Sequence, residues 1–407
     1  MPVKWKAKGA FNPSVILGKV NEIRRVDEHR AVSFAGVELH EYMAVLQSML
    51  VFPTAVEDVE WSALIWAVLG SPATEMTPGN FLLALNAELT RSLSVRLQRY
   101  FLLTSLSVRS DRLPSQVRIA DTVIRFLPAE YPRRFRSRDS ALHGLALPVA
   151  APPTTYCKVI VETQAKSCAA AVNKAFKTLD LYRALWCLQS NPQMVFAFGR
   201  SSVSAINVVR LGSVHTLHND DGSSSASAVW FEPGYSEARP FSFREPEKTH
   251  ARNRLSLRLI RACNYGEQLA AALVRYVRAL DQQDPNGAFL GLWGALESLT
   301  TPAIADYDKT VRRCAFLFKD SAYHAQVLEH LRTCRNSFVH SGSTFDGAQT
   351  HCYQLQFYFA SLFWFHIGNA RFFSSLEEAN EFLDSPVSLM ELKRRQRLLI
   401  KALKYVG

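Results

Sequence analysis

The feature that most constrains the fold is a change in the spacing of apolar residues near Arg252. Beyond this point, apolar side chains recur at three- and four-residue intervals in one segment after another. This spacing places them on one face of an α-helix, so each segment is expected to form an amphipathic helix. The expected helices are Leu269–Leu280, Phe289–Leu299, Val311–Phe318, Ala325–Phe338, Tyr353–Asn369 and Ser388–Lys404. Together they predict an all-α helical bundle over residues 252–407.

The residues before 150 show both helical and strand patterns. Thr77 and Pro78, followed by apolar residues at helical spacing, predict a capped helix. The segments Tyr100–Val108 and Val117–Leu127 are rich in β-branched and aromatic residues, so we expect two strands paired as a hairpin. The proline-rich stretch 147–153 continues neither a helix nor a strand ladder, and it predicts a linker.

A second mixed region follows this linker. Its patterns predict a helix over Ala165–Leu188, a solvent-exposed loop at 219–225, and strands at Tyr156–Val161, Val195–Phe198, Ala205–Leu211 and Ala226–Phe231. We therefore expect an α+β protein in three parts. These are an α/β region over 1–150, a second α/β region over 151–245 that stands alone or forms one domain with the first, and the helical bundle over 252–407.

Charge and cysteine content narrow the partners and the compartment. The net charge of +11 favours polyanionic partners such as RNA, DNA or an acidic membrane surface. The seven cysteines are scattered and form no C-x-x-C pair, which argues against a disulfide framework and against a thiolate zinc site. We therefore expect a cytoplasmic protein without a metal or cofactor.

Membrane insertion and secretion are not expected. The longest apolar run, Leu355–Ile367, is shorter than the roughly 20 residues of a membrane span. The first residues are basic but reach glycine, asparagine and proline before the apolar core of a signal peptide can form. The apolar run is therefore expected to be a core helix.

One helix carries a cluster of reactive side chains. Arg335, Asn336 and His340 are followed by Ser341 and Gly342, a natural helix end. On a wheel of about 100° per residue, Asn336 and His340 lie on the face opposite the apolar stripe, and Arg335 lies at its edge. The spacing itself is not informative, because it recurs at Arg24/His29, Arg138/His143 and Arg210/His215.

The preceding helix adds an acidic residue in an apolar setting. Glu297 lies within the segment Leu292–Leu299, whose other residues are almost all apolar. A carboxylate is costly to bury unless it meets a cation or a hydrogen-bond donor. Arg335, Arg312 and Arg313 are the candidate partners.

These two helices, L-W-x-A-L-E-x-L and R-N-x-x-x-H-x-G, resemble HEPN domains, particularly the ApeA-like group, over roughly residues 255–370. The resemblance implies a bundle of four or five helices, a head-to-head homodimer and metal-independent RNA endonuclease activity. It implies that Arg335, Asn336 and His340 form the reactive cluster. Many members of the family are toxins or effectors of antiviral defence, which suggests the same role here.

The residue types suit RNA cleavage. RNA carries its own nucleophile, the 2′-OH, so an enzyme needs only proton transfer and charge stabilisation. His340 is expected to move the proton, Arg335 to bind the phosphate, Asn336 to hold the phosphate or orient His340, and Glu297 to position Arg335. The residues expected to bind RNA along its backbone are Arg332, Lys393, Arg394 and Arg397. The basic carboxy-terminal helix fits a solvated face equally well.

Two other functions remain open. The bundle fits a non-catalytic HEPN module that binds a nucleotide or RNA and supplies dimerisation. A DNA-binding regulator is the weaker alternative, because no helix-turn-helix signature is present. By analogy alone, the amino-terminal α/β portion is expected to sense a phage or cellular trigger.

Overall fold

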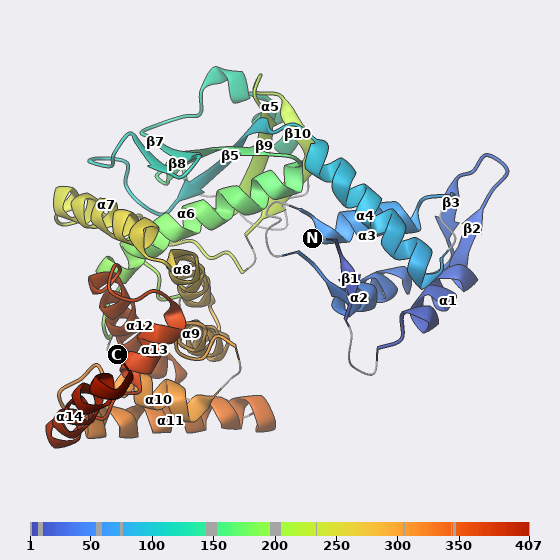
Figure 1. Cartoon of the computed structure of the whole chain (residues 1–407). Helices are drawn as coiled ribbons and strands as arrows, with labels where there is room; N and C mark the ends of the chain where they lie inside the picture. Colours follow the sequence, from blue (N-terminus) through green and yellow to red (C-terminus); the bar gives the residue numbers. More distant parts are fainter. Residues whose placement is uncertain are drawn as a thin grey trace. The chain divides into compact units, whose positions relative to one another are not determined.

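The computed structural model (Figure 1) describes residues 2–6, 11–53, 59–73, 76–143, 153–195, 205–232, 234–303, 306–342, 344 and 347–406. The described residues form helices and β-sheets, which confirms the α+β class. The chain divides into two compact units. The first comprises residues 1–101, 162–175 and 217–226, and the second comprises 102–161, 176–216 and 227–407.

The first unit contains a small helical core with two short strand pairs. Its helices are α1 (Pro13–Ile23), α2 (Leu39–Met49), α3 (Trp61–Leu69) and α4 (Pro78–Ser94). Its strand pairs are β1 (Lys4–Trp5) with β4 (Leu50–Val51) and β2 (Arg24–Val26) with β3 (Val32–Phe34). The start of α4 confirms the expected cap, because Oγ1 of Thr77 accepts a hydrogen bond from the backbone N–H of Asn80 at 3.3 Å.

A six-stranded sheet is the main β element. The strands follow the order β10 (Ser224–Phe231), β9 (Val214–Asn219), β5 (Gln98–Leu106), β8 (Cys157–Ala165), β7 (Thr122–Leu127) and β6 (Gln116–Ile119). The long helix α6 (Cys168–Ser190) packs against β7, where the Phe126 ring lies 5.3 Å from the ring of Trp186. A 3₁₀ turn (Arg133–Phe135) and the short helix α5 (Ser137–Leu142) follow β7. The strand at 156–161, the helix at 165–188 and the strand at 226–231 are thus confirmed.

The expected hairpin was assigned to the wrong strands. The segment Val117–Leu127 folds back on itself, so that β6 pairs with β7 antiparallel and Ile119 lies opposite Thr122. Strand β5 lies between β9 and β8 instead. The turn residue Ala120 has a φ of 50°, a conformation usually taken by glycine in such tight turns. The sequence has no glycine or asparagine at this turn, so the pattern that usually marks a two-residue hairpin turn is missing.

The strand expected at Ala205–Leu211 is also wrong. This segment is irregular and makes a single bridge, from Leu211 to Leu106. The Asn207 side chain fixes it by donating to the Val277 carbonyl at 2.6 Å and to Asp281 at 2.7 Å. The hydrogen-bond partners of Asn207 lie about 70 residues later in the sequence, so no local pattern of residues predicts this conformation.

Three further expectations concern a loop, a short strand and a linker. The loop expected at 219–225 is a tight turn, and β10 already begins at Ser224. The strand expected at Val195–Phe198 and the linker at 147–153 lie outside the described residues, except for Val195 and Pro153.

The residues from 246 onward form helices alone within the described part. They are α7 (Pro246–Ala262), α8 (Gly266–Leu280), α9 (Pro285–Thr300), α10 (Tyr307–Ala315), α11 (Ser321–Ser341), α12 (Ala348–Gly368), α13 (Leu376–Leu383) and α14 (Leu389–Val406). Each of the six expected helices is present, although α10 begins and ends earlier than the expected Val311–Phe318; α7 and α13 are additional. Helices α8, α9 and α12 form the core, in which the Tyr276 ring stacks on Phe359 at 4.6 Å.

The apolar run in α12 is a core helix, as expected. Leu355, Phe359, Leu362 and Phe363 on this helix are fully buried. Among the described residues, no helix combines the length and the apolar character needed to cross a membrane.

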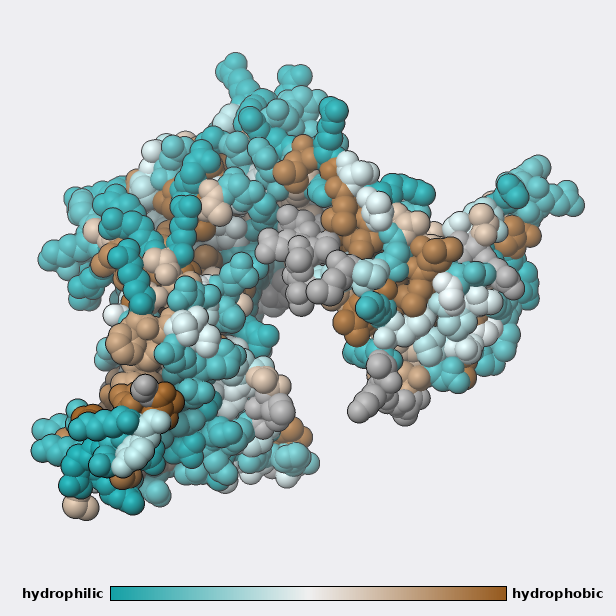
Figure 2. Space-filling model, in the orientation of Figure 1, coloured by the Kyte–Doolittle hydropathy of each residue, from teal (hydrophilic) through white to brown (hydrophobic). Residues whose placement is uncertain are grey.

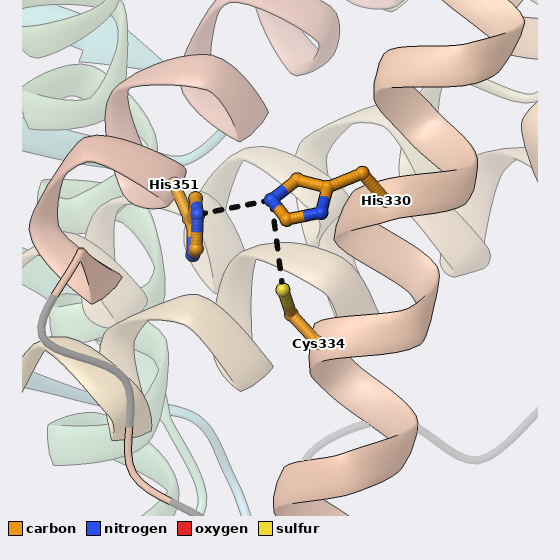
Figure 3. Close-up of side chains that lie close together, drawn as sticks. All are labelled: His330, Cys334 and His351. Atoms are coloured by element: carbon orange, nitrogen blue, oxygen red, sulfur yellow. Dashed lines mark hydrogen bonds between the residues drawn. The ribbon is translucent and has the colours of Figure 1, made fainter.

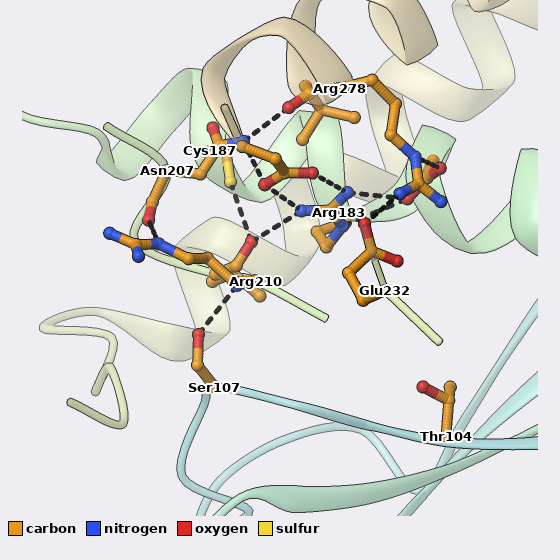
Figure 4. Close-up of polar contacts among 12 residues, drawn as sticks. Thr104, Ser107, Arg183, Cys187, Asn207, Arg210, Glu232 and Arg278 are labelled. Carbon is orange, nitrogen blue, oxygen red and sulfur yellow. Dashed lines mark hydrogen bonds and ion pairs between the residues drawn. The ribbon is translucent and has the colours of Figure 1, made fainter. Parts of the chain in front are cut away.

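A buried ionic network joins α6 to α8 within the second unit (Figure 4). Arg183 is fully buried and donates to both carboxylate oxygens of Asp281, at 2.8 and 2.7 Å, and to Asp180 at 2.8 Å. Arg278 of α8 donates to Asp180 and to Glu232, both at 2.5 Å. The buried cation Arg183 therefore meets two carboxylates, which offsets the cost of removing its charge from water.

Candidate functional site at the end of helix α11

The local sequence defines both ends of α11. At its start, Oδ1 of Asp320 accepts a hydrogen bond from the backbone N–H of Tyr323 at 3.1 Å. At its end, Gly342 adopts a φ of 63°, and its N–H donates to the Phe338 carbonyl at 3.0 Å. A left-handed residue at this position favours glycine, so the helix stops where the sequence predicts. His340 therefore lies in the last turn.

The structure places Asn336 and His340 away from the core, as the wheel predicts. Leu328, Leu331 and Cys334 are buried against the bundle, whereas Asn336 is half-buried and His340 is exposed. Side chains four residues apart share one face of a helix, so this amide and imidazole point the same way. Within the described residues, no hydrogen bond or ion pair engages the His340 ring. It is open to an incoming ligand.

Arg335 is held by uncharged partners. Its guanidinium lies 4.5 Å from the ring centroid of Tyr307, the first residue of α10. Its Nη1 donates to Oδ1 of Asn336 at 3.2 Å. No carboxylate of the described residues forms an ion pair with Arg335. Its positive charge is therefore oriented but not neutralised.

Glu297 has a different partner from the one expected. Its Oε1 accepts a hydrogen bond from Nε1 of Trp293, one turn earlier in α9, at 2.8 Å. The candidate cations Arg312 and Arg313 instead pair with Asp384, which follows α13. Among the described residues, no ion pair joins Glu297 to an arginine. The expected positioning of Arg335 by Glu297 is therefore not seen. Glu297 is half-buried, and its Oε1 accepts from a donor on the same helix.

The residues expected to bind RNA along its backbone differ in their surroundings. Arg332 pairs with Asp308 and, at 2.7 Å, with Glu329. On α14, Arg394 pairs with Glu391 at 3.2 Å, while Lys393 and Arg397 are exposed and form no ion pair with other described residues. Among these four residues, Lys393 and Arg397 thus have accessible positive charges. Arg332 and Arg394 would have to release their carboxylate partners to bind phosphate.

The three other arginine–histidine pairs do not build a comparable site. Arg138 is buried and donates to Thr216 at 2.6 Å, and the Arg210 guanidinium donates to backbone carbonyls. His215 is buried on β9 against Thr104, at 2.7 Å. Arg24 lies in β2 and its guanidinium donates to the Leu69 carbonyl at 3.1 Å. Of these four pairs, only Arg335 and His340 lie on one helix with the histidine exposed.

The structure also brings together residues that the sequence analysis did not single out. His330, Cys334 and His351 converge between α11 and α12 (Figure 3). All seven cysteines are free, so no disulfide framework exists. The absence of a C-x-x-C pair does not exclude a site that contains one cysteine and two histidines. The available signal was a histidine and a cysteine four residues apart, which share a helix face.

The comparisons with known proteins add no assignment. The chain matches no protein-family model, no curated protein and no solved structure. The resemblance to HEPN domains therefore rests on the residues of α9 and α11 alone, and it stays a prediction.

Proposed function

We propose that the helical part of the chain is a metal-independent RNA endonuclease whose reactive residues are Arg335, Asn336 and His340. One observation carries the proposal. The end of α11 presents an exposed imidazole together with an arginine that has no carboxylate partner among the described residues. An oriented, uncompensated guanidinium is suited to bind a phosphodiester, and an accessible imidazole is suited to move a proton.

The reaction requires no other nucleophile than the RNA itself. His340 accepts the proton of a 2′-OH, the 2′ oxygen attacks the adjacent phosphorus, and the bond to the 5′ oxygen breaks. The leaving oxygen takes up a proton, which gives a 2′,3′-cyclic phosphate and a 5′-OH. Arg335 uses one donor on Asn336, and its other N–H groups remain to stabilise charge on the phosphate.

A homodimer would complete this site. The reaction uses a base and an acid, and this cluster contains one histidine in each chain. Two copies of α11 that meet at their carboxy-terminal ends would supply a second His340. The neighbouring side chain of Val339 is 47% exposed, which leaves apolar surface for such a contact. Light scattering on the purified protein tests this part of the proposal, and a monomeric mass under cleavage conditions would remove it.

The decisive variant is His340→Ala. Purified protein is incubated with single-stranded RNA in EDTA, and we expect the variant to lower the cleavage rate by about 100-fold or more, because general acid–base catalysis contributes that much. The matched control is His29→Ala, because His29 is also exposed and also follows an arginine by five residues. Circular dichroism establishes that both variants are folded. Undiminished cleavage by His340→Ala would remove the nuclease proposal.

A non-catalytic module for RNA binding and dimerisation is the second candidate. One observation favours it: Glu297 accepts a hydrogen bond from Trp293, so the role expected of Glu297 in catalysis, to position Arg335, is not seen. In that case the wild type binds RNA tightly but cuts none of it. The proposed role as a toxin or defence effector, triggered through the amino-terminal region, rests on the HEPN resemblance. The test is the growth of cells that express the wild-type protein or the Arg335→Ala variant. If this role is right, only the wild type should slow growth.

A further inference from the structure

Three side chains with metal-binding atoms converge between α11 and α12, ahead of His340 in the sequence of α11. His330 and Cys334 lie one turn apart on α11, and His351 lies in the first turn of α12 (Figure 3). Nε2 of His330 lies 3.3 Å from Nε2 of His351 and 3.8 Å from Sγ of Cys334. All three ligand atoms lie within 4.8 Å of one another.

Two of these three separations are close to those of ligands around one zinc ion. Zinc binds imidazole nitrogen at about 2.0–2.1 Å and thiolate sulfur at about 2.3 Å, in a tetrahedral arrangement. From these bond lengths, two nitrogen ligands lie about 3.3 Å apart, and a nitrogen and a sulfur ligand lie about 3.6 Å apart. The nitrogen pair already has this separation, and the nitrogen–sulfur pair exceeds it by about 0.2 Å.

Hydrogen bonding alone explains the cluster less well. Nε2 of His330 has two polar neighbours, His351 and Cys334. This nitrogen either donates one proton or accepts one, so a single tautomer makes a good hydrogen bond with only one of these two neighbours. A metal ion accepts a lone pair from all three atoms at once. His330 is exposed, while Cys334 is only 6% exposed, so an ion can enter from solvent and reach a partly shielded sulfur.

We propose that His330, Cys334 and His351 bind a zinc ion, with a fourth position open to water or another ligand. Two imidazoles and a thiolate form a borderline-soft ligand set that suits Zn²⁺ rather than Mg²⁺ or Ca²⁺. The ion would tie α11 to α12 directly before Arg335. The inference goes beyond the proposed nuclease, because the RNA reaction passes through His340 and not through the ion.

Cobalt is the probe, because its spectrum reports thiolate ligands and tetrahedral geometry. Untagged full-length protein is freed of metal and titrated with Co²⁺ under reducing conditions. We expect an intense near-ultraviolet sulfur-to-cobalt band and visible bands that saturate at one Co²⁺ per chain, and addition of Zn²⁺ should abolish both. Zinc should also raise the melting temperature of the wild type, because it binds the folded state.

The variants separate this site from other thiols and histidines. Cys334→Ser and His330→Gln should lose the cobalt bands and the zinc-induced rise in melting temperature. Because His330 is exposed, its variant should fold even if Cys334→Ser does not. The controls Cys168→Ser and His340→Ala should keep both signals. Absence of the bands from the wild type, or their persistence in folded His330→Gln, would overturn the proposal. Neither result depends on RNA cleavage.

Discussion

At the scale of single residues, burial separates the histidines into different roles. His340 is exposed at the end of α11, whereas His366 is completely buried in α12, where its Nδ1 lies 3.0 Å from the Tyr265 hydroxyl. Burial disfavours the charged imidazolium and lowers the pKa of His366 to about 4. His366 is therefore a neutral core residue, and an exposed ring such as that of His340 is better placed to exchange protons with a substrate.

The lowered pKa of His366 predicts a pH-dependent stability. An unfolded histidine has a pKa of about 6.5, so between about pH 6.5 and pH 4 the unfolded state binds a proton that the folded state does not. The free energy of unfolding should therefore fall as the pH falls through this window, by about 3 kcal/mol in full. His366→Gln should flatten this dependence, measured by urea unfolding across the window. An unchanged slope in the variant would contradict the assignment.

At the scale of elements, α11 was predictable because its signals are local. The apolar stripe lies within the helix, and Gly342 directly follows its last residue. The start was placed too late, at Ala325, because the capping residue Asp320 was not recognised. The positions of Asn336 and His340 on its outer face follow from the same stripe. The pairing of Arg312 and Arg313 with Asp384 was not predictable, because Asp384 follows α13 and meets α10 only through packing. The convergence of His351 on α11 likewise depends on the angle between two helices. The hydrogen bond from Trp293 to Glu297 joins side chains four residues apart on one helix, so it was a local possibility that the sequence analysis missed.

The link between α6 and α8 rests on Arg183. Arg183→Ala would remove the fully buried cation that pairs with both Asp180 and Asp281. Asp180 itself is only 2% exposed. Removal of one partner from a buried pair typically costs about 3–5 kcal/mol. We expect a loss of unfolding free energy of that order in denaturant titrations. Arg109→Ala removes the exposed pair with Asp111 and should have little effect. Equal stability of the two variants would contradict a structural role for the network.

At the scale of the whole molecule, charge and exposed apolar surface come together on α14. None of its described residues is buried, and Leu399 and Leu403 are 66% and 71% exposed. Figure 2 shows apolar side chains beside polar ones over this helix, at the lower left. Lys393 and Arg397 lie on the same helix. The sequence shows the positive charge of this helix. It does not show that the other described residues leave the apolar side chains of the helix exposed.

The end groups of the cleaved RNA test the central claim most directly. If the 2′-OH is the nucleophile and His340 removes its proton, each cut leaves a 2′,3′-cyclic phosphate on one fragment and a 5′-OH on the other. Mass spectrometry of the fragments should detect these ends. A single 2′-deoxynucleotide placed before the cleaved bond should abolish that cut. Fragments with 3′-OH and 5′-phosphate ends, or cleavage after the deoxynucleotide, would contradict the proposed mechanism.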